Sequence, residues 1–305
     1  MKQRLKHWCK SPTWRAVLYW LLPAAFLGIF FYQPLLALFN LIISPEWDFS
    51  LADLDWGKLW DPLWFTVFQA TLSTLLTLMI GLPGAWMFAR FSFPGKKLLK
   101  LLTTLPFILP TVVVAAGFNA LLGPRGWANL GLMALFNLDT PPIEFLNTFW
   151  AILTAHVFYN TTIIIRVVSN AWAGQNIRLR HAATVLGASP WKVFKEVTLP
   201  LLRPSILSAT LLVFLFNFTS FGVVLMLGGP QFATLEVEIY IQALHLLNLP
   251  LAAVLSILQL IFTLGITIGY NRLSGLRDIA VAPRSQQGGL RKPKTLLERF
   301  MILIL

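Results

Sequence analysis

The stretch HAATVLGASPWKVFKEVTLP, residues 181–200, lies in a basic segment between two long apolar stretches. Just before it, Asn176 can cap a helix, because its side chain can accept a hydrogen bond from a free backbone amide of the first turn. Gly187 follows the last apolar position of that helix, where glycine most readily adopts the left-handed conformation that ends a helix. Ser189 and Pro190 then supply an N-cap and a first-turn proline for a second helix. The sequence therefore predicts two short helices joined at Gly187.

Both predicted helices are amphipathic. Apolar residues recur at helical spacing in each of them, at Leu179, Ala182, Ala183 and Leu186 in the first and at Trp191, Phe194 and Val197 in the second. The Leu-Pro pair at 199–200 predicts the end of the second helix. Two interpretations fit: a surface on which another protein docks, or a connecting loop whose apolar stripes lie on the bilayer surface.

The composition is that of an integral membrane protein. Hydrophobic residues make up 57% of the chain and charged residues only 12%. A helix of about 20 apolar residues crosses a hydrocarbon core of roughly 30 Å. We therefore predict an all-α fold, a polytopic transmembrane helical bundle of about six spans, at residues 16–43, 63–89, 101–122, 147–168, 204–227 and 249–271.

The net charge of +12 follows the topology of these spans. Of the 24 basic residues, all but Lys58 and Arg125 fall on one side of the predicted bundle, while nine of the twelve acidic residues fall on the other. The positive-inside rule then places both termini and the 169–203 loop in the cytoplasm. Nucleic acid is not expected as a partner, because no soluble module is long enough to present a basic face with interleaved aromatic residues.

No catalytic or metal-binding pattern is present. The chain has no GxxxxGK[ST] phosphate loop, so we do not expect it to hydrolyse ATP. The four histidines show neither HxxxH nor HExxH spacing, and we predict no metal site. The sequence thus favours a transport protein over an enzyme.

Polar residues interrupt two of the predicted spans. Burying such groups in hydrocarbon is costly unless they face the bundle interior, so they should border a translocation pathway or form hydrogen bonds between helices. The candidate pathway residues are His156 and Asn160, four apart on one helix face, and Asn217, Thr219 and Ser220. Both interpretations stay open for this set.

Prolines interrupt the third span. Pro106 and Pro110 lie in LPFILP, and each removes a backbone donor and bends a helix. In lipid the freed carbonyls need neighbours or water. Such a break either lines a cavity or shapes the packing of the bundle.

The spacing of the opening stretch resembles the EAA loop of ABC importer permeases. The small pair, the glycine, the hydrophobic residue at 197 and the Leu-Pro pair all match, but the first position, usually Glu, is His181. In that family the loop forms a coupling helix that sits in a groove of a cytoplasmic ATPase. The resemblance assigns ATPase coupling to His181, Ala182, Ala183, Gly187, Ala188, Ser189, Pro190, Leu199 and Pro200. It also puts a charge-dependent contact at position 181 in doubt.

The resemblance implies a multi-pass permease of the bacterial inner membrane with a cytoplasmic N-terminus. Its expected partners are cytoplasmic ABC ATPase subunits, a periplasmic substrate-binding protein, a second permease half or a second copy, and membrane lipid. No cofactor is expected on this chain, since ATP and Mg would bind the partner ATPase. Alternating access driven by ATP is the implied mechanism.

Further stretches resemble the thiamine and ferric-iron branch of these permeases. They are RFSFPGKKLL (90–99), LPFILPTVVVA (105–115), GPRGW (123–127), AHVFYN (155–160) and FTSFGVVLMLGGPQFATLEVEIYIQAL (218–244). The expected solute is therefore thiamine or ferric iron, and the sequence does not separate the two.

The apolar spans and the basic stretches between them also predict the domain organisation. Residues 1–15 are a cytoplasmic segment, 16–271 the six-span domain, 272–294 a basic linker, and 295–305 an apolar tail too short to span. Because this branch usually fuses two halves, we expect the tail to begin a seventh span of a longer permease. The competing interpretation is a complete half that pairs with itself or a partner.

The rival class is a secondary transporter or channel driven by an ion gradient. Such proteins usually carry intramembrane acidic or basic relay residues. Within the six predicted cores we find no acid, and Arg166 lies near a cytoplasmic end. This pattern favours an external energy source, although some uniporters also lack such charges.

Overall fold

The computed structural model describes residues 14–43, 55–229 and 231–275, and these residues form helices and connecting loops without a β-strand. This confirms the predicted all-α class. The predicted N-terminal segment, basic linker and apolar tail lie almost entirely outside the described residues.

Two compact units make up the chain. The smaller takes in Met1–Trp56 and Ile239–Leu258, and the larger takes in Gly57–Glu238 and Gln259–Leu305. The smaller unit holds α1 (Trp14–Leu27), a π-helical turn (Gly28–Tyr32), α2 (Gln33–Ile43) and a second π-helical turn (Ile241–His245). Helix α13 (Leu235–Tyr240) and helix α14 (Leu249–Gly275) contribute residues to both units.

The larger unit carries the functional residues. Its helices are α3 (Trp56–Arg90), α4 (Lys96–Leu102), α5 (Leu105–Ile108), α6 (Thr111–Leu122), α7 (Trp127–Phe136), α8 (Phe149–Ala173), α9 (Ile177–Val185), α10 (Pro190–Val193), a π-helical turn (Phe194–Thr198), α11 (Leu199–Phe218) and α12 (Phe221–Leu227).

Five helical segments are long and apolar enough to cross a membrane. They are Tyr19–Ile43, Trp56–Arg90, Phe149–Ala173, Pro190–Phe218 and Leu249–Arg272. A sixth crossing is reached only if the bent pair Lys96–Ile108 and Thr111–Phe136 counts as one span. The predicted count of about six is thus confirmed, with one broken member.

The third predicted span, 101–122, is not a continuous helix. It breaks after Ile108, and the two helical pairs on either side of the break are bent by 106°. Leu109 is extended, with φ −69° and ψ 137°, because the ring of Pro110 disfavours the helical conformation in the residue before it. The LPFILP motif therefore turns the chain as well as weakening the helix.

The fifth predicted span also differs. The sequence predicts that Leu199 and Pro200 end the second short helix, but α10, the π-helical turn and α11 run without interruption from Pro190 to Phe218. The wider turn, in which the Leu199 amide donates to the Phe194 carbonyl, accommodates the proline that would clash in a regular α-helix. The helix ends instead at Phe218, inside the predicted span 204–227.

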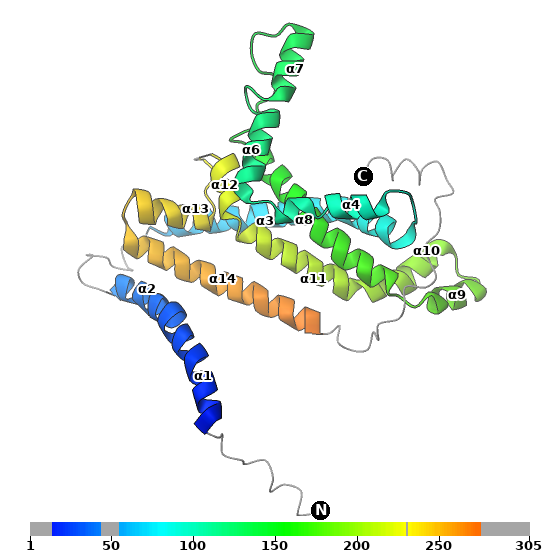
Figure 1. Ribbon diagram of the computed structural model, residues 1–305, viewed down its shortest axis with the longest axis horizontal. Helices are drawn as coiled ribbons and strands as arrows, with labels where there is room; N and C mark the ends of the chain where they lie inside the picture. The colour runs from blue at the N-terminus through cyan, green and yellow to red at the C-terminus, as the bar shows by residue number, and fades with distance from the viewer. Residues whose placement is uncertain (1–13, 44–54, 230, 276–305) are drawn as a thin grey trace, which may run out of the picture. The chain divides into compact units, whose positions relative to one another are not determined.

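Helix α8 is the centre of the larger unit. Ile163, Ile164 and Val168 pack between Ala85 of α3 and residues Ala209 and Val213 of α11. Nearer its N-terminus, α8 packs through Ala151 and Ala155 against α6 and α12. Figure 1 shows α8 lying alongside α3 and α11.

Glycine permits the close approach of α3 to α8. A Cβ atom at Gly81 would lie 2.7 Å from Cβ and Cγ2 of Ile164, a separation that real contacts do not reach. Both atoms sit next to the backbone of a buried residue, so Ile164 cannot swing away without moving α8. The position therefore requires glycine for packing.

Substitution of Gly81 should destabilise the bundle. We expect Gly81→Val to lower stability by about 1–3 kcal/mol, because overpacking forces the backbones apart. Gly117→Val on α6 is the matched control, since nothing lies within 4 Å of its added Cβ. Thermal unfolding in detergent measures both variants, and equal melting temperatures for the two would contradict the packing argument.

Candidate functional site

Residues 176–198 form a helical hairpin with the predicted caps. The Asn176 side chain accepts a hydrogen bond of 3.0 Å from the Arg178 amide at the start of α9. Ser189 accepts one of 3.4 Å from the Lys192 amide at the start of α10, and Pro190 occupies the first turn. The local prediction of two capped helices is confirmed, although the second continues into α11.

The joint of the hairpin is a Schellman motif. Gly187 has φ +83°, and its amide donates to the Thr184 carbonyl at 3.0 Å. The Ala188 amide donates to the Ala183 carbonyl, also at 3.0 Å. These two bonds satisfy carbonyl groups that the end of α9 would leave free. The predicted left-handed glycine therefore fixes the angle at which the two arms meet.

Aromatic side chains anchor the second arm to the end of α8. Phe194 stacks on both Trp172 and Trp191, with ring centroids 6.1 and 5.6 Å away. Gln175 donates from Nε2 to the carbonyl of buried Thr198 at 3.0 Å. The hairpin is thus held at its base.

The tip is apolar and exposed. Val185 and Leu186, directly before Gly187, are 86% and 87% exposed. The predicted coupling residues differ in exposure: Ala183, Ala188 and Leu199 are half-buried, and His181, Ala182, Gly187, Ser189, Pro190 and Pro200 are exposed. The sequence analysis missed Val185, and the signal that could have found it is an apolar pair immediately before a helix-ending glycine.

A buried polar network joins α3, α8 and α11. Asn160 donates from Nδ2 to Oδ1 of Asn217 at 2.7 Å, and Asn217 donates from Nδ2 to Oγ1 of Thr74 at 3.1 Å. Nδ1 of His156 lies 3.0 Å from Oγ of Ser73. All five side chains are at most 4% exposed. The predicted residues on α8 and α11 therefore do form interhelical hydrogen bonds.

The sequence analysis missed the contribution of α3. Gln69 donates from Nε2 to the backbone carbonyl of Asn217 at 2.8 Å. That carbonyl lies in the last turn of α11, where the helix offers no amide partner. Polar residues at helical spacing, Gln69, Ser73 and Thr77, were the available signal in an otherwise apolar segment.

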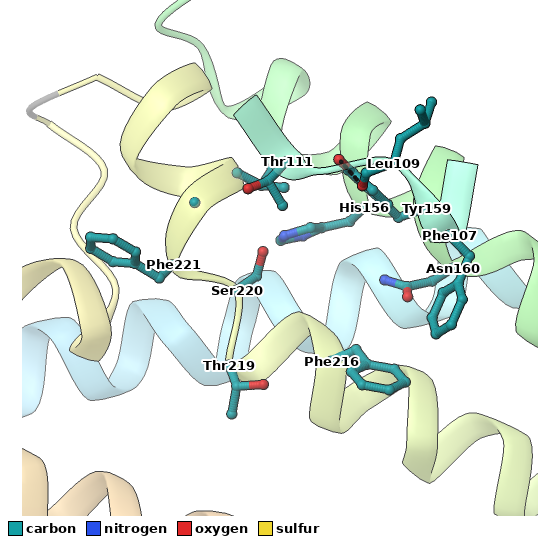
Figure 2. Close-up of a pocket in the computed structure, with 12 residues that line it drawn as sticks. Phe107, Leu109, Thr111, His156, Tyr159, Asn160, Phe216, Thr219, Ser220 and Phe221 are labelled. Carbon is teal, nitrogen blue, oxygen red and sulfur yellow. Dashed lines mark hydrogen bonds between the residues drawn. The ribbon is translucent and has the colours of Figure 1, made fainter. Parts of the chain in front are cut away.

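A pocket of about 330 Å³ opens beside this network. His156, Asn160, Thr219 and Ser220 line it, together with residues around the break between α5 and α6 (Figure 2). Asn217 does not line the pocket, because its side chain is engaged with Asn160 and Thr74. Four of the five predicted pathway residues thus line one pocket. The fifth, Asn217, forms hydrogen bonds to the lining residue Asn160 and to Thr74.

Glu236, near the start of α13, contacts the beginning of α12. Its Oε1 accepts a bond of 3.1 Å from Nε2 of Gln259, and its carboxylate accepts another from the backbone amide of Phe221, the first residue of α12. Burial raises the pKa of Glu236 to about 6, although these hydrogen bonds act to lower it. The carboxylate therefore holds the beginning of α12 in place.

Comparison with known proteins identifies a family and a fold. The family described as "Binding-protein-dependent transport system inner membrane component" matches residues 78–275. The thiamine transport system permease protein ThiP of Haemophilus influenzae is 34% identical over 79% of this chain and 44% of its own length. The molybdenum transport system permease protein ModB of Azotobacter vinelandii is 34% identical over 54% of this chain and 70% of its own length.

The fold also resembles solved structures. A crystal structure of a bacterial ABC transporter involved in the import of the acidic polysaccharide alginate matches with a TM-score of 0.69 and 20% identity, over 87% of this chain and 96% of that one. At this identity the likeness supports the fold alone. The chain spans less than half the length of the thiamine relative that it matches.

The titration of Glu236 should affect stability. The folded state holds this proton more tightly than the unfolded chain, so its stabilising contribution is complete below pH 4.5 and is lost as the pH rises through about 6. We expect Glu236→Gln to flatten the dependence of melting temperature on pH across this window. Glu238→Gln is the control on the same helix, and a wild-type pH profile in Glu236→Gln would refute the assignment.

Proposed function

Because the chain belongs to the family of binding-protein-dependent transport system inner membrane components, we propose that it is the permease subunit of an ABC importer. In this role it forms part of a route across the bacterial inner membrane, and a separate cytoplasmic subunit binds ATP and Mg and hydrolyses the nucleotide. A periplasmic binding protein delivers the solute, and a second permease half or copy completes the pathway.

The observation that carries this proposal is the exposed apolar tip of the α9–α10 hairpin. Val185 and Leu186 protrude beside a backbone turn fixed by Gly187, with Trp191, 70% exposed, on the neighbouring arm. Burial of two such aliphatic side chains stabilises an interface by about 1.5–3 kcal/mol each. Exposed apolar side chains beside a fixed turn are more stable when they are buried in a groove of a partner subunit than when they are in water.

Force applied at the tip can pass into the bundle along one helix. The second arm continues as α11 to Phe218, a length of roughly 40 Å for 29 residues. Asn217, near the far end, bonds to both α3 and α8. We propose that movement of the hairpin is transmitted along this helix to the pocket, which opens alternately to the two sides of the membrane.

Thiamine is the solute that we propose. The support is the identity of 34% to a thiamine permease over most of the chain, whereas the molybdenum permease at the same identity matches a shorter part of it. Ferric iron, the other solute expected from the sequence, receives no comparable support.

Substitution of Gly187 should uncouple the chain from its ATPase. A β-branched side chain at φ +83° costs about 1–2 kcal/mol, so the free Gly187→Val chain should relax to another turn. Restoring the native turn on binding would then reduce ATPase association roughly 5- to 30-fold. Gly187→Asn is the matched control, because asparagine tolerates the left-handed conformation. Co-purification of ATP-binding subunits with the tagged full-length gene product, at equal membrane levels, measures both. Absence of an ATPase from every form, or equal amounts with Gly187→Val and wild type, would overturn the proposal.

A further inference from the structure

The pocket lies where two helices are broken. Leu109 and Thr111 border it at the break between α5 and α6, and Thr219 and Ser220 border it at the break between α11 and α12. Continuous helix α8 provides His156 on the wall between them. Non-helical backbone is tolerated at membrane depth where it is buried in protein or lines a cavity, and discontinuous helices often form the solute sites of transporters.

Aromatic rings make up much of the wall. Phe107 and Phe216 meet edge to face with centroids 5.8 Å apart, and Tyr159 and Phe221 complete the set. In Figure 2, Phe221 lies on one side of His156 and the Phe107–Phe216 pair on the other. The volume of about 330 Å³ falls in the range of small-molecule sites and exceeds the needs of a single small oxyanion.

His156 presents a hydrogen-bonding atom that the protein does not satisfy. Ser73 engages Nδ1, whereas Nε2 has no partner among the described residues, although the side chain is only 1% exposed. The ring points toward Ser220 and Thr111 (Figure 2). A buried polar atom without a partner costs about 1–3 kcal/mol, a cost that a bound solute would remove.

The remaining lining groups are neutral. Among the described residues that line the pocket, the polar side chains are the hydroxyls of Thr111, Tyr159, Thr219 and Ser220, the amide of Asn160 and the imidazole of His156. A sulfate-like or molybdate-like anion would find no Lys or Arg there, whereas aromatic faces attract both neutral rings and cations. The chemistry favours a planar ring over an oxyanion.

We infer that this pocket is a solute-binding site for a planar aromatic nitrogen heterocycle, neutral or cationic, which stacks on Phe216 and hydrogen-bonds to Nε2 of His156. The inference rests on the proposed function and specifies the class of solute that passes through this half of the pathway. Thiamine, a cation with two heteroaromatic rings, belongs to this class.

Equilibrium binding of radiolabelled thiamine to the full-length transporter in lipid nanodiscs tests the site. Phe216→Leu should raise the Kd roughly 5- to 30-fold, since it removes a stacking and cation–π partner. Phe214→Leu is the matched control, because Phe214 lies on the same helix, stacks on Phe218 and does not line the pocket. Its Kd should stay within about twofold of wild type, as expected for a site away from the ligand.

A second pair of variants separates binding from packing. His156→Asn places an amide where Nδ1 meets Ser73 but removes Nε2, whereas His156→Gln reaches the position of Nε2. Thiamine binding should fall about tenfold in His156→Asn, as for a lost hydrogen bond, and recover in part in His156→Gln. Equal affinities across all four variants, or no thiamine binding to wild type, would overturn the inference.

The full-length transporter with its binding protein, reconstituted in sealed liposomes, allows uptake to be measured and separates the inferred solute class from the proposed importer function. If wild type retains its ATPase and accumulates molybdate but not thiamine, the inferred solute class is wrong while the proposed importer stands. If no ATPase is bound and neither probe accumulates with ATP, the proposed function itself is wrong. Thiamine accumulation that declines with Phe216→Leu and not with Phe214→Leu supports both.

Discussion

The buried hydrogen bonds that join α3, α8 and α11 constrain the rest of this structure. Asn160, Asn217 and Thr74 form hydrogen bonds with one another inside the bundle, and Gln69 supplies the partner that the end of α11 lacks. In lipid, each of these groups would be costly without its neighbours. The network therefore fixes the relative register of three helices, and it does so at the level where α11 stops.

The break in α11 and the break before α6 depend on this arrangement. Both expose backbone that water or side chains must satisfy, and both border the same cavity beside His156. On the cytoplasmic side that we propose for the hairpin, α9 and α10 meet at Gly187, and α10 is continuous with α11. A single helix thus links the exposed apolar tip to the polar network, which is the geometry that mechanical coupling requires.

Local signals predicted the hairpin well. Asn176, Gly187 and Ser189 act within one turn of the chain, so their capping roles follow from residue type and spacing alone. Two features depended on longer-range packing and could not be predicted this way: the size of the bend at Leu109 and the passage of the helix through Pro200. The helical spacing of polar residues on α3 could have been recognised in the sequence. Their hydrogen-bond partners, 83 to 148 residues away, could not be predicted from it. Hydrogen bonds between helices were one of two alternatives for the polar set that includes Asn160 and Asn217, but the pairing of these two residues was not predicted.

We propose that an ATP-binding subunit covers the hairpin tip, and photo-crosslinking in native membranes would detect this contact. A photoreactive residue in place of Val185 should form an adduct with a cytoplasmic ATPase, and one in place of exposed Lys58, predicted to lie on the opposite side of the membrane, should not. An adduct from position 185 alone is the result that we predict. Absence of an ATPase adduct from position 185, or an equal adduct from position 58, would contradict the account.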